Sequence, residues 1–204
     1  MAVSSTSVKG FSYTKAILGV DAPNQLLFIL KSSSQFTIGD AVRLNTSGLL
    51  VRCANTDPAV LGIVQGFYDQ TGNLGVFSPR ISGAAIAGAT LTPDDTITTA
   101  SDNSSNGLKK LSAYVIPNIA GEVLYRNVAN GSLTQVNVGA FFNVVSSNAG
   151  QIDQASASFT NGQFQLVSLD PDGDSDATKG LFRIAQGQLV SNFVSYGSNA
   201  VITA

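Results

Sequence analysis

Residues 36–66 read FTIGDAVRLNTSGLLVRCANTDPAVLGIVQG, the clearest series of strands and turns in the chain. Short runs of apolar and β-branched residues alternate with Gly, Asn-Thr-Ser-Gly and Asp-Pro, a pattern typical of strands joined by tight turns. The runs at residues 41–44 and 49–53 flank residues 45–48 (NTSG) and predict a β-hairpin with a glycine-containing loop. Residues 60–67 (VLGIVQGF) predict the following strand.

The same pattern extends in both directions from this stretch. Gly62 and Gly66 interrupt the strand at 60–67 and mark a bulge or a close approach of two backbones. On the N-terminal side, residues 26–31 (LLFILK) indicate a buried strand. Further strands are expected at residues 74–77, 111–116, 122–128, 133–138, 141–145, 163–169, 180–185 and 189–194.

The second half of the chain repeats the style of the first. Asn130-Gly131 lies between the runs at 122–128 and 133–138 and predicts a second hairpin. The two halves echo each other in pattern but not residue by residue, so a duplicated module is left as an open alternative. No segment shows the apolar periodicity of a confident helix.

These patterns predict an all-β protein with two β-sandwich or barrel-like lobes, an extended N-terminal arm and little or no helix. The arm is expected over residues 1–25, where the chain is polar and then mixed. The N-terminal lobe is expected over residues 26–112, with a loop or linker rich in Ser, Thr and Asp at 92–107. The C-terminal lobe is expected over residues 113–204.

Composition excludes several classes of partner. Charged residues make up only 12% of the chain, about half the usual share; such a surface suits a chain packed against neighbours or an ordinary polar β protein. A net charge of −2, with Lys109-Lys110 as the one basic cluster, argues against nucleic-acid binding. The apolar run at 26–30 is too short to span a membrane, and the N-terminus has no apolar core like that of a secretory signal.

Reactive side chains are scarce. The chain has no His, which excludes Ser-His and Cys-His nucleophiles and leaves no expectation of a zinc site. The single Cys53 excludes an intrachain disulfide and is interpreted as a small core residue of a protein made in a reducing cytoplasm. We therefore expect no enzymatic activity and no cofactor.

An acidic loop is the one cluster with ligand-like spacing. Its carboxylates alternate along the chain, as at the start of an EF-hand loop, and can converge on a hard cation. The sixth position is Ser175 instead of Gly and the twelfth is Leu181 instead of Glu, so the calcium prediction is weak. A solvated loop, or a salt bridge to a neighbouring subunit, are the alternatives. The four residues are Asp170, Asp172, Asp174 and Asp176.

Five segments taken in order carry a resemblance to a known family. They are residues 38–42 (IGDAV), 61–72 (LGIVQGF, then Asp69 and Gly72), 113–117 (AYVIP), 139–143 (GAFFN) and 165–184, a strand followed by an Asp-Pro-Asp loop and another strand. This series resembles the capsid decoration, or cement, proteins of tailed double-stranded DNA bacteriophages. The resemblance covers most of residues 26–190 and rests on fold-like motifs, not on catalytic ones.

The resemblance implies a structural protein on the outer surface of the virion, synthesised in the host bacterial cytoplasm. Such a protein clamps neighbouring major capsid subunits and stabilises the mature head. The implied partners are the major capsid protein and further copies of the chain, as a trimer or alternatively a dimer, with no nucleic acid and no membrane. The arm is the expected capsid or subunit contact, through Phe11, Tyr13, Ile17 and Leu18.

Other functions stay open at this point. A receptor- or carbohydrate-binding virion module would use the acidic loop and the tyrosines Tyr68, Tyr114, Tyr125 and Tyr196. An Asp-based hydrolase would need two carboxylates at catalytic separation in a pocket. A tail or connector subunit would share the composition of a head protein.

Overall fold

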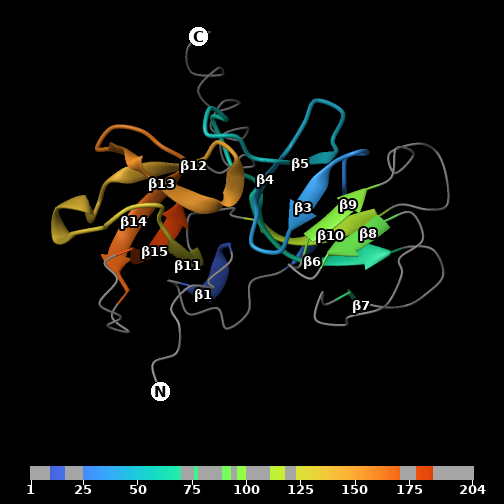
Figure 1. The fold of residues 1–204 in the computed structure, drawn as a ribbon, viewed down its shortest axis with the longest axis horizontal. Coiled ribbons are helices and arrows are strands. Elements are labelled where there is room, and N and C mark those ends of the chain that lie inside the picture. Colours follow the sequence, from blue (N-terminus) through green and yellow to red (C-terminus); the bar gives the residue numbers. More distant parts are fainter. Residues whose placement is uncertain are drawn as a thin grey trace, which may run out of the picture.

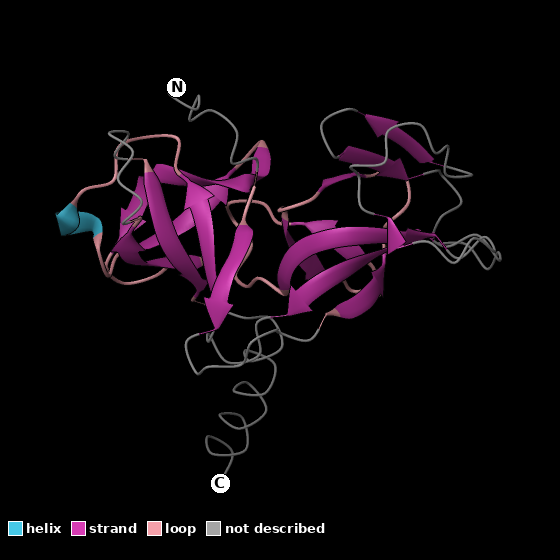
Figure 2. Cartoon of the chain, turned by 90° about the horizontal axis from the view of Figure 1, so that it is seen from below, coloured by secondary structure: helices cyan, strands magenta, loops and turns pink. Residues whose placement is uncertain are grey.

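The structure is a computed structural model that describes residues 10–16, 25–69, 76–77, 89–92, 96–99, 111–117, 123–170 and 178–185. The all-β prediction is confirmed, because within these residues the strands pair antiparallel and the helical structure is limited to one 3-10 turn, η1 (Gln135–Asn137). Two strand-rich lobes lie side by side (Figures 1 and 2).

The N-terminal lobe is a barrel of five strands, in the order β2-β10-β6-β4-β5. A parallel bridge between Leu30 and Leu50 links the end of β2 to β5 and closes the barrel. The short strand β7 (Val76–Phe77) adds to β6. The barrel strands are β2 (Leu26–Ile29), β4 (Ala41–Leu44), β5 (Leu50–Arg52), β6 (Gly62–Asp69) and β10 (Leu111–Pro117).

The C-terminal lobe is a second barrel, in the order β11-β15-β14-β12-β13. A parallel bridge between Ala129 and Ile152 links the end of β11 to β13. The amide of Asn127 reinforces this closure, since its Nδ2 donates to the Gly150 carbonyl at 2.9 Å and its Oδ1 accepts from the Ile152 N–H at 3.3 Å. The strands are β11 (Val123–Val128), β12 (Phe141–Val145), β13 (Asn148–Ser158), β14 (Phe164–Leu169) and β15 (Lys179–Ile184).

The two barrels have the same topology. Numbered in sequence order within each lobe, the strands follow the order first, fifth, fourth, second, third, with antiparallel neighbours. Each barrel closes with a parallel bridge from the residue after its first strand to its third strand. The N–H of the next residue donates to the Leu50 carbonyl at 3.0 Å in one barrel and to the Ile152 carbonyl at 2.9 Å in the other. The duplicated module is therefore present at the level of topology.

Local details repeat as well. A glycine with positive φ precedes the second strand of each barrel, Gly39 at +86° and Gly139 at +91°. The Gly39 N–H donates to the Val64 carbonyl at 2.9 Å, and the Gly139 N–H donates to the Leu166 carbonyl at 2.8 Å. A bulge also recurs at the same place in the fourth strand, because Gln65 and Val167 are each the extra residue opposite the fifth strand. Glycine is required at 39 and 139 because other residues rarely adopt this backbone conformation.

A three-stranded sheet distinguishes the N-terminal lobe. It has the order β3-β9-β8 and contains β3 (Gln35–Thr37), β8 (Ala89–Thr92) and β9 (Thr96–Thr99). The linker predicted at 92–107 is wrong at residues 96–99, where Ile97 is buried in the N-terminal core and Thr99 Oγ1 donates to the Lys31 carbonyl at 2.7 Å. A run of β-branched residues with one apolar anchor is enough for a strand when a partner strand lies beside it. Residues 93–95 and 100–107 lie outside the described part.

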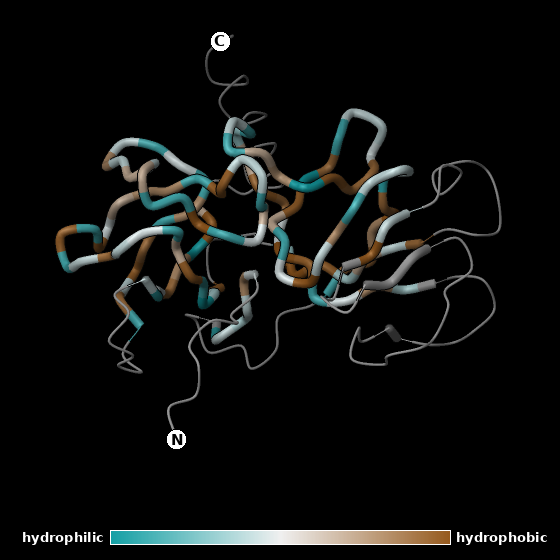
Figure 3. The backbone as a smooth tube through the Cα atoms, in the orientation of Figure 1, coloured by the Kyte–Doolittle hydropathy of each residue, from teal (hydrophilic) through white to brown (hydrophobic). Residues whose placement is uncertain are grey.

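Both faces of the N-terminal sheet are used. Val42 and Val64 point into the N-terminal core, whereas their neighbours Ala41 and Ile63 belong to the cluster that fills the C-terminal barrel. This alternation follows from the two-residue period of a strand. The apolar segments (brown in Figure 3) therefore form one cluster inside each barrel, and the second reaches across the junction between them.

The N-terminal arm is a strand of the C-terminal lobe. β1 (Ser12–Ala16) pairs antiparallel with β11, and the Phe11 N–H donates to the Gly39 carbonyl at 2.9 Å. The expectation of an extended arm over residues 1–25, separate from the two lobes, is thus wrong for residues 11–16, because β11 offers them an open strand edge. Residues 1–9 and 17–24 lie outside the described part.

Two further expectations are corrected. The lobe boundary at 112/113 falls inside β10, which pairs along its whole length with β6 of the N-terminal barrel. The hairpin predicted around Asn130-Gly131 is also wrong, because β11 pairs with β1 and β15. Asn130 instead accepts a hydrogen bond at Oδ1 from the Gln154 N–H at 2.8 Å. By contrast, the hairpin predicted at 41–53 is confirmed as β4 and β5.

Candidate interaction surface

Large apolar side chains on the surface are candidates for contact with a partner, because a partner that covers them removes apolar area from water. Among the described residues, five such side chains are exposed. They lie on the first strand of the N-terminal barrel and on turns and one strand of the C-terminal barrel. They are Leu26, Leu27, Val136, Phe159 and Val167.

Val136 and Phe159 are the most exposed of the five, at 77% and 69%. Val136 belongs to η1, which precedes β12, and Phe159 follows Ser158, which pairs with Phe141 at the start of β12. Both side chains therefore lie at the same end of the C-terminal barrel. Figure 2 shows η1 (cyan) at the outer end of this lobe, away from the N-terminal barrel. We call Val136 and Phe159 the tip patch.

Leu26 and Leu27 lie on the edge of β2. Within the described residues β2 pairs only with β10, and the two leucines are 43% and 41% exposed. The expectation of a buried strand at 26–31 is therefore confirmed as a strand but wrong for the burial of its first two residues. Their apolar character predicted that other side chains would cover both faces of the strand. In the described part of the chain this burial begins only at Phe28.

Two tyrosines continue the outward face of β2. Leu27 pairs with Tyr114 on β10, and the ring of Tyr114 contacts Tyr68 on β6 edge-on, with centroids 6.1 Å apart. The structure thus brings together two of the four tyrosines considered for carbohydrate binding. Tyr125 is fully buried in the C-terminal core, so its proposed surface role is wrong, and Tyr196 lies outside the described residues.

The predicted arm contacts fall in different environments. Phe11 is buried in the chain's own core, where it stacks on Phe164 at 4.4 Å between ring centroids, so it is not a surface anchor. Tyr13 is half-buried and packs against the same cluster. Ile17 and Leu18 lie outside the described residues. The prediction fails for Phe11 because β1 pairs with the edge of β11. This pairing places the Phe11 ring in the core of the chain's own C-terminal barrel, against Tyr125 and Phe164.

Asp170 of the acidic loop is held by an ion pair. Arg126 Nε lies 2.8 Å from Asp170 Oδ2, and Arg126 Nη2 donates to Oδ1 at 3.2 Å, a two-pronged arrangement that occupies both carboxylate oxygens. Asp172, Asp174 and Asp176 lie outside the described part of the chain. Within the described part, no group of three or more His, Cys, Asp or Glu side chains converges as a metal site would require.

Cys53 confirms its interpretation as a core residue. Its side chain is buried, and burial raises the pKa of the thiol far above its ordinary range. A thiol in this state is a poor nucleophile.

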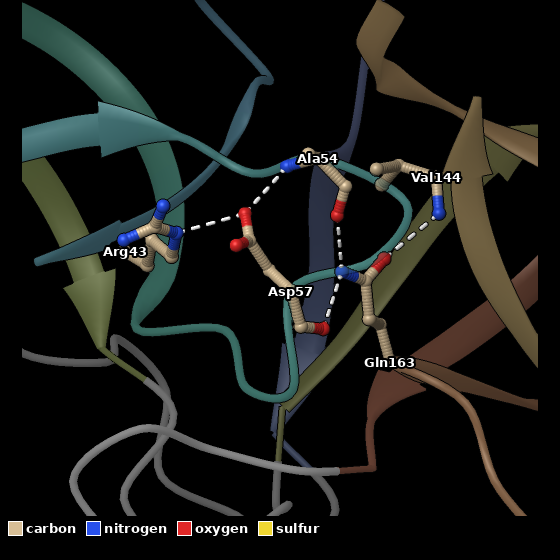
Figure 4. A network of polar contacts seen from close by, with 5 residues as sticks. All are labelled: Arg43, Ala54, Asp57, Val144 and Gln163. Carbon is tan, nitrogen blue, oxygen red and sulfur yellow. Dashed lines mark hydrogen bonds and ion pairs between the residues drawn. The ribbon is translucent and has the colours of Figure 1, made fainter. Parts of the chain in front are cut away.

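A polar network joins the two barrels (Figure 4). Gln163, which precedes β14, is buried, and its Nε2 donates to the carbonyls of Ala54 at 2.7 Å and Asp57 at 3.0 Å in the N-terminal lobe. Its Oε1 accepts from the Val144 N–H at 2.9 Å. Asp57 is held in turn by Arg43, whose Nε lies 2.8 Å from Oδ2. The junction between the barrels is thus specified by hydrogen bonds as well as by packing.

Substitution of Gln163 by leucine is expected to lower the free energy of unfolding by about 2–4 kcal/mol, because two carbonyls and one N–H then lose their buried partner. Gln165→Leu is the matched control, since Gln165 is only half-buried and makes its bonds to Gly139 and Arg183 within the C-terminal lobe. Urea unfolding of both variants measures the difference. Equal losses in the two variants would contradict a special role of Gln163 at the junction.

Asp40 is a buried carboxylate at the start of β4. Its Oδ2 accepts from the Thr37 N–H at 2.8 Å and lies 2.9 Å from Arg52 Nε. Burial raises the pKa of Asp40 to about 6, although the Arg52 charge and the hydrogen bond from Thr37 oppose the rise. The native state therefore retains a proton on Asp40 at pH values where the unfolded chain has released it.

This shift predicts a pH-dependent stability. Because the pKa in the folded chain lies above the ordinary value of 3.8, Asp40 stabilises the fold below pH 4, and this contribution is lost as the pH rises through about 6. The loss is on the order of 3 kcal/mol. We expect the wild-type chain to lose this much stability relative to Asp40→Asn between pH 4 and pH 8. Denaturant unfolding at several pH values checks this, and parallel profiles for the two proteins would refute it.

Comparison with known proteins gives no match. No protein-family model matches the chain, and neither the curated proteins nor the solved structures include a significantly similar one. A separate examination of the described residues finds no helix that is long and apolar enough to cross a membrane.

Proposed function

We propose that this chain is a structural virion protein that binds the outer surface of a phage head and clamps neighbouring major capsid subunits. The tip patch is the observation that carries the proposal. Two large apolar side chains stand on turns at one end of a barrel, which suits insertion into shallow depressions of a protein surface. The low share of charged residues supports a wet, hydrogen-bonded contact around these anchors.

The hydrogen-bonded junction between the barrels fits a clamp. A protein that holds subunits together transmits force between its contacts, and the bonds of Gln163 resist separation of the two lobes. Many copies on one shell add their individual weak contacts by avidity. In this proposal the chain acts with further copies of itself, as a trimer or a dimer.

Binding to isolated heads tests the proposal. Purified protein is expected to bind expanded, DNA-free heads of the phage that encodes it and to raise the temperature at which the heads disrupt. Val136→Asp combined with Phe159→Asp is expected to weaken binding by at least about tenfold, since two apolar anchors are replaced by charges that resist desolvation. Both side chains are exposed, so the fold is expected to persist.

Ser147→Asp is the control variant. Ser147 is exposed on the turn between β12 and β13, at the opposite end of the same barrel, so this variant adds charge away from the tip patch. Heads whose disruption temperature is unchanged by the protein would reject the capsid function. Equal losses of binding for the tip-patch and Ser147 variants would reject the tip patch as the contact.

A second candidate function is binding of a carbohydrate or receptor. The row formed by Leu27, Tyr114 and Tyr68 favours it, because half-buried aromatic rings beside an exposed apolar side chain form a platform for a ring-shaped ligand. A glycan array separates the two functions. Tyr68→Ala is expected to abolish any glycan signal while leaving head binding unchanged.

A further inference from the structure

Comparison of the two barrels shows that, among the described residues, one strand edge is covered in the C-terminal barrel and its counterpart in the N-terminal barrel is not. Strand β11 has a neighbour on each side, β15 and β1. Strand β2 is the first strand of the N-terminal barrel, as β11 is of the C-terminal one. In the part of the chain that the structure describes, β2 has β10 on one side and no strand along the other, apart from the closing bridge at Leu30.

Equivalent residues on the two strands differ sharply in burial. Tyr125 pairs with Phe182, and Leu26 pairs with Val115, at the same position relative to the bulge in each barrel. Tyr125 is 0% exposed and meets the ring of Phe11 edge-on, with centroids 6.3 Å apart. Leu26 is 43% exposed. The residue before β1 thus covers one barrel where the other is open.

The backbone of β2 is oriented to receive a strand. The Leu30 N–H donates to the Leu111 carbonyl of β10, whereas the Lys31 N–H points the other way and donates to the Leu50 carbonyl. Since successive residues of a strand point their N–H groups to opposite sides, the Leu27 N–H and carbonyl face the open edge. No charged residue, proline or bulge within β2 protects this edge, and such edges readily add another strand.

We infer that the open edge of β2 receives an antiparallel strand from the C-terminal segment of the protein, residues 186–204. In this arrangement a large apolar side chain of the segment covers Leu26, as Phe11 covers Tyr125. The N-terminal segment then completes the C-terminal barrel, and the C-terminal segment completes the N-terminal barrel. The inference does not depend on the proposed function.

The sequence of the segment fits this role. Residues 189–196 read LVSNFVSY, a run of β-branched and aromatic residues without a charge. Its Phe193 and Tyr196 supply aromatic side chains, as Phe11 and Tyr13 do at the other barrel, with two residues between them instead of one. An edge that is apolar on both faces favours an uncharged strand over a charged one.

Amide hydrogen exchange of the full chain, followed by NMR, tests the inference. Phe193→Asp combined with Val194→Asp is expected to speed exchange of the Leu27 N–H by about tenfold or more, because its hydrogen-bond partner is lost. The Leu30 N–H, bonded to Leu111, is the internal reference and is expected to be unchanged. Val201→Asp combined with Ile202→Asp is the matched control and is expected to leave Leu27 exchange unchanged.

Exchange at Leu27 that is the same in wild type and in the Phe193/Val194 variant overturns the inference. If exchange is then slow in both, another occupant covers the edge, such as β2 of a second copy or a different protein. If it is fast in both, the edge is open.

Disulfide trapping identifies the chain that supplies the segment. Leu26→Cys combined with Phe193→Cys is expected to oxidise to a bond, and Cys53 stays outside the reaction because it is buried. A bond within one chain and a bond between two copies both support the inference and distinguish its two forms. Val167→Cys combined with Phe193→Cys is the control, since Val167 is exposed on the other barrel. Equally fast trapping in the control overturns the inference.

Discussion

Replacement of Phe11 by alanine is expected to lower the free energy of unfolding by about 3–5 kcal/mol, the usual cost of removing a buried aromatic ring. The ring is 3% exposed, stacks on Phe164 and meets Tyr125 edge-on. Its loss opens a cavity at the end of the C-terminal barrel. The same change weakens the attachment of β1, whose antiparallel pairing with β11 depends on the anchored residue before it.

Ser12→Ala is the matched control for this prediction, because Ser12 follows Phe11 on the same strand and is exposed. We expect it to change stability by less than about 0.5 kcal/mol. Denaturant unfolding of both variants gives the comparison. A loss below about 1 kcal/mol for Phe11→Ala would indicate a ring without close packing, and it would restore the interpretation of Phe11 as a residue reserved for an external partner.

Substitution of Gly39 by alanine is expected to cost about 3 kcal/mol or more, through backbone strain and a clash together. Gly39 has a φ of +86°, and a Cβ placed there would lie 2.8 Å from Gly10 Cα and 2.8 Å from the Phe11 nitrogen. These are backbone atoms, which cannot rotate away as the end of a side chain can. The alanine is therefore expected to push Gly10 and Phe11 away from Gly39.

Gly139 provides a control from the same protein. It occupies the equivalent position of the other barrel with a φ of +91°, but a Cβ there would meet nothing within 4 Å. Gly139→Ala is therefore expected to cost only the conformational strain, about 1 kcal/mol. The difference between the two variants in urea unfolding measures the clash alone. Equal losses would show that the crossing of Gly10 and Gly39 is not tightly packed.

Elements specified by local chemistry were predicted correctly from the sequence. The hairpin of β4 and β5 has its turn held by Asn45, whose Oδ1 accepts from the N–H groups of Ser47 and Leu49, both at 2.9 Å. Gly62 and Gly66 also have their predicted roles. A Cβ on Gly62 would lie 2.1 Å from the Ile116 carbonyl oxygen, and Gly66 lies at the bulge opposite Tyr114.

Elements specified by distant partners were not predicted. The dipeptide Asn130-Gly131 favours a hairpin, yet β15 and β1 compete successfully for the two edges of β11. Residues 96–99 look like a linker because only Ile97 is apolar. Their strand pairs with β8 just before it and with β3, which lies more than fifty residues earlier. Pairings between distant segments leave little local signal in the chain.

The sequence left the duplication of the barrel as an open alternative, because the two halves differ in their side chains. Equivalent positions of the two barrels have the same backbone pairing, but some of their side chains are apolar in one barrel and charged in the other. Leu27 and Tyr68 on the N-terminal barrel correspond to Arg126 and Asp170 on the other, so an apolar row stands where the second barrel has an ion pair. A comparison of the two half-sequences depends on side-chain identity, which is not kept. The repeat is recognised from the strand pairing and its register, which are kept.

The candidate contacts were also hidden in the sequence. The run LLFIL has the composition of a core strand, and the exposure of Leu26 and Leu27 depends on which neighbours fold beside them. Val136 and Phe159 had a weak signal, since each is a single large apolar residue among polar residues of a turn. Such isolated residues are common on protein surfaces, so the pattern alone does not single them out.

The position of β1 has a consequence for the synthesis of the protein. A ribosome completes Phe11 long before Phe164, the residue on which its ring stacks. At usual elongation rates the delay is on the order of ten seconds. Throughout that interval the ring of Phe11 lacks its stacking partner, and β1 lacks its pairing strand until β11 is made, so the full attachment of β1 must be a late step of folding. In a nascent chain the full capture of β1 therefore reports that synthesis has passed β11 and reached β14.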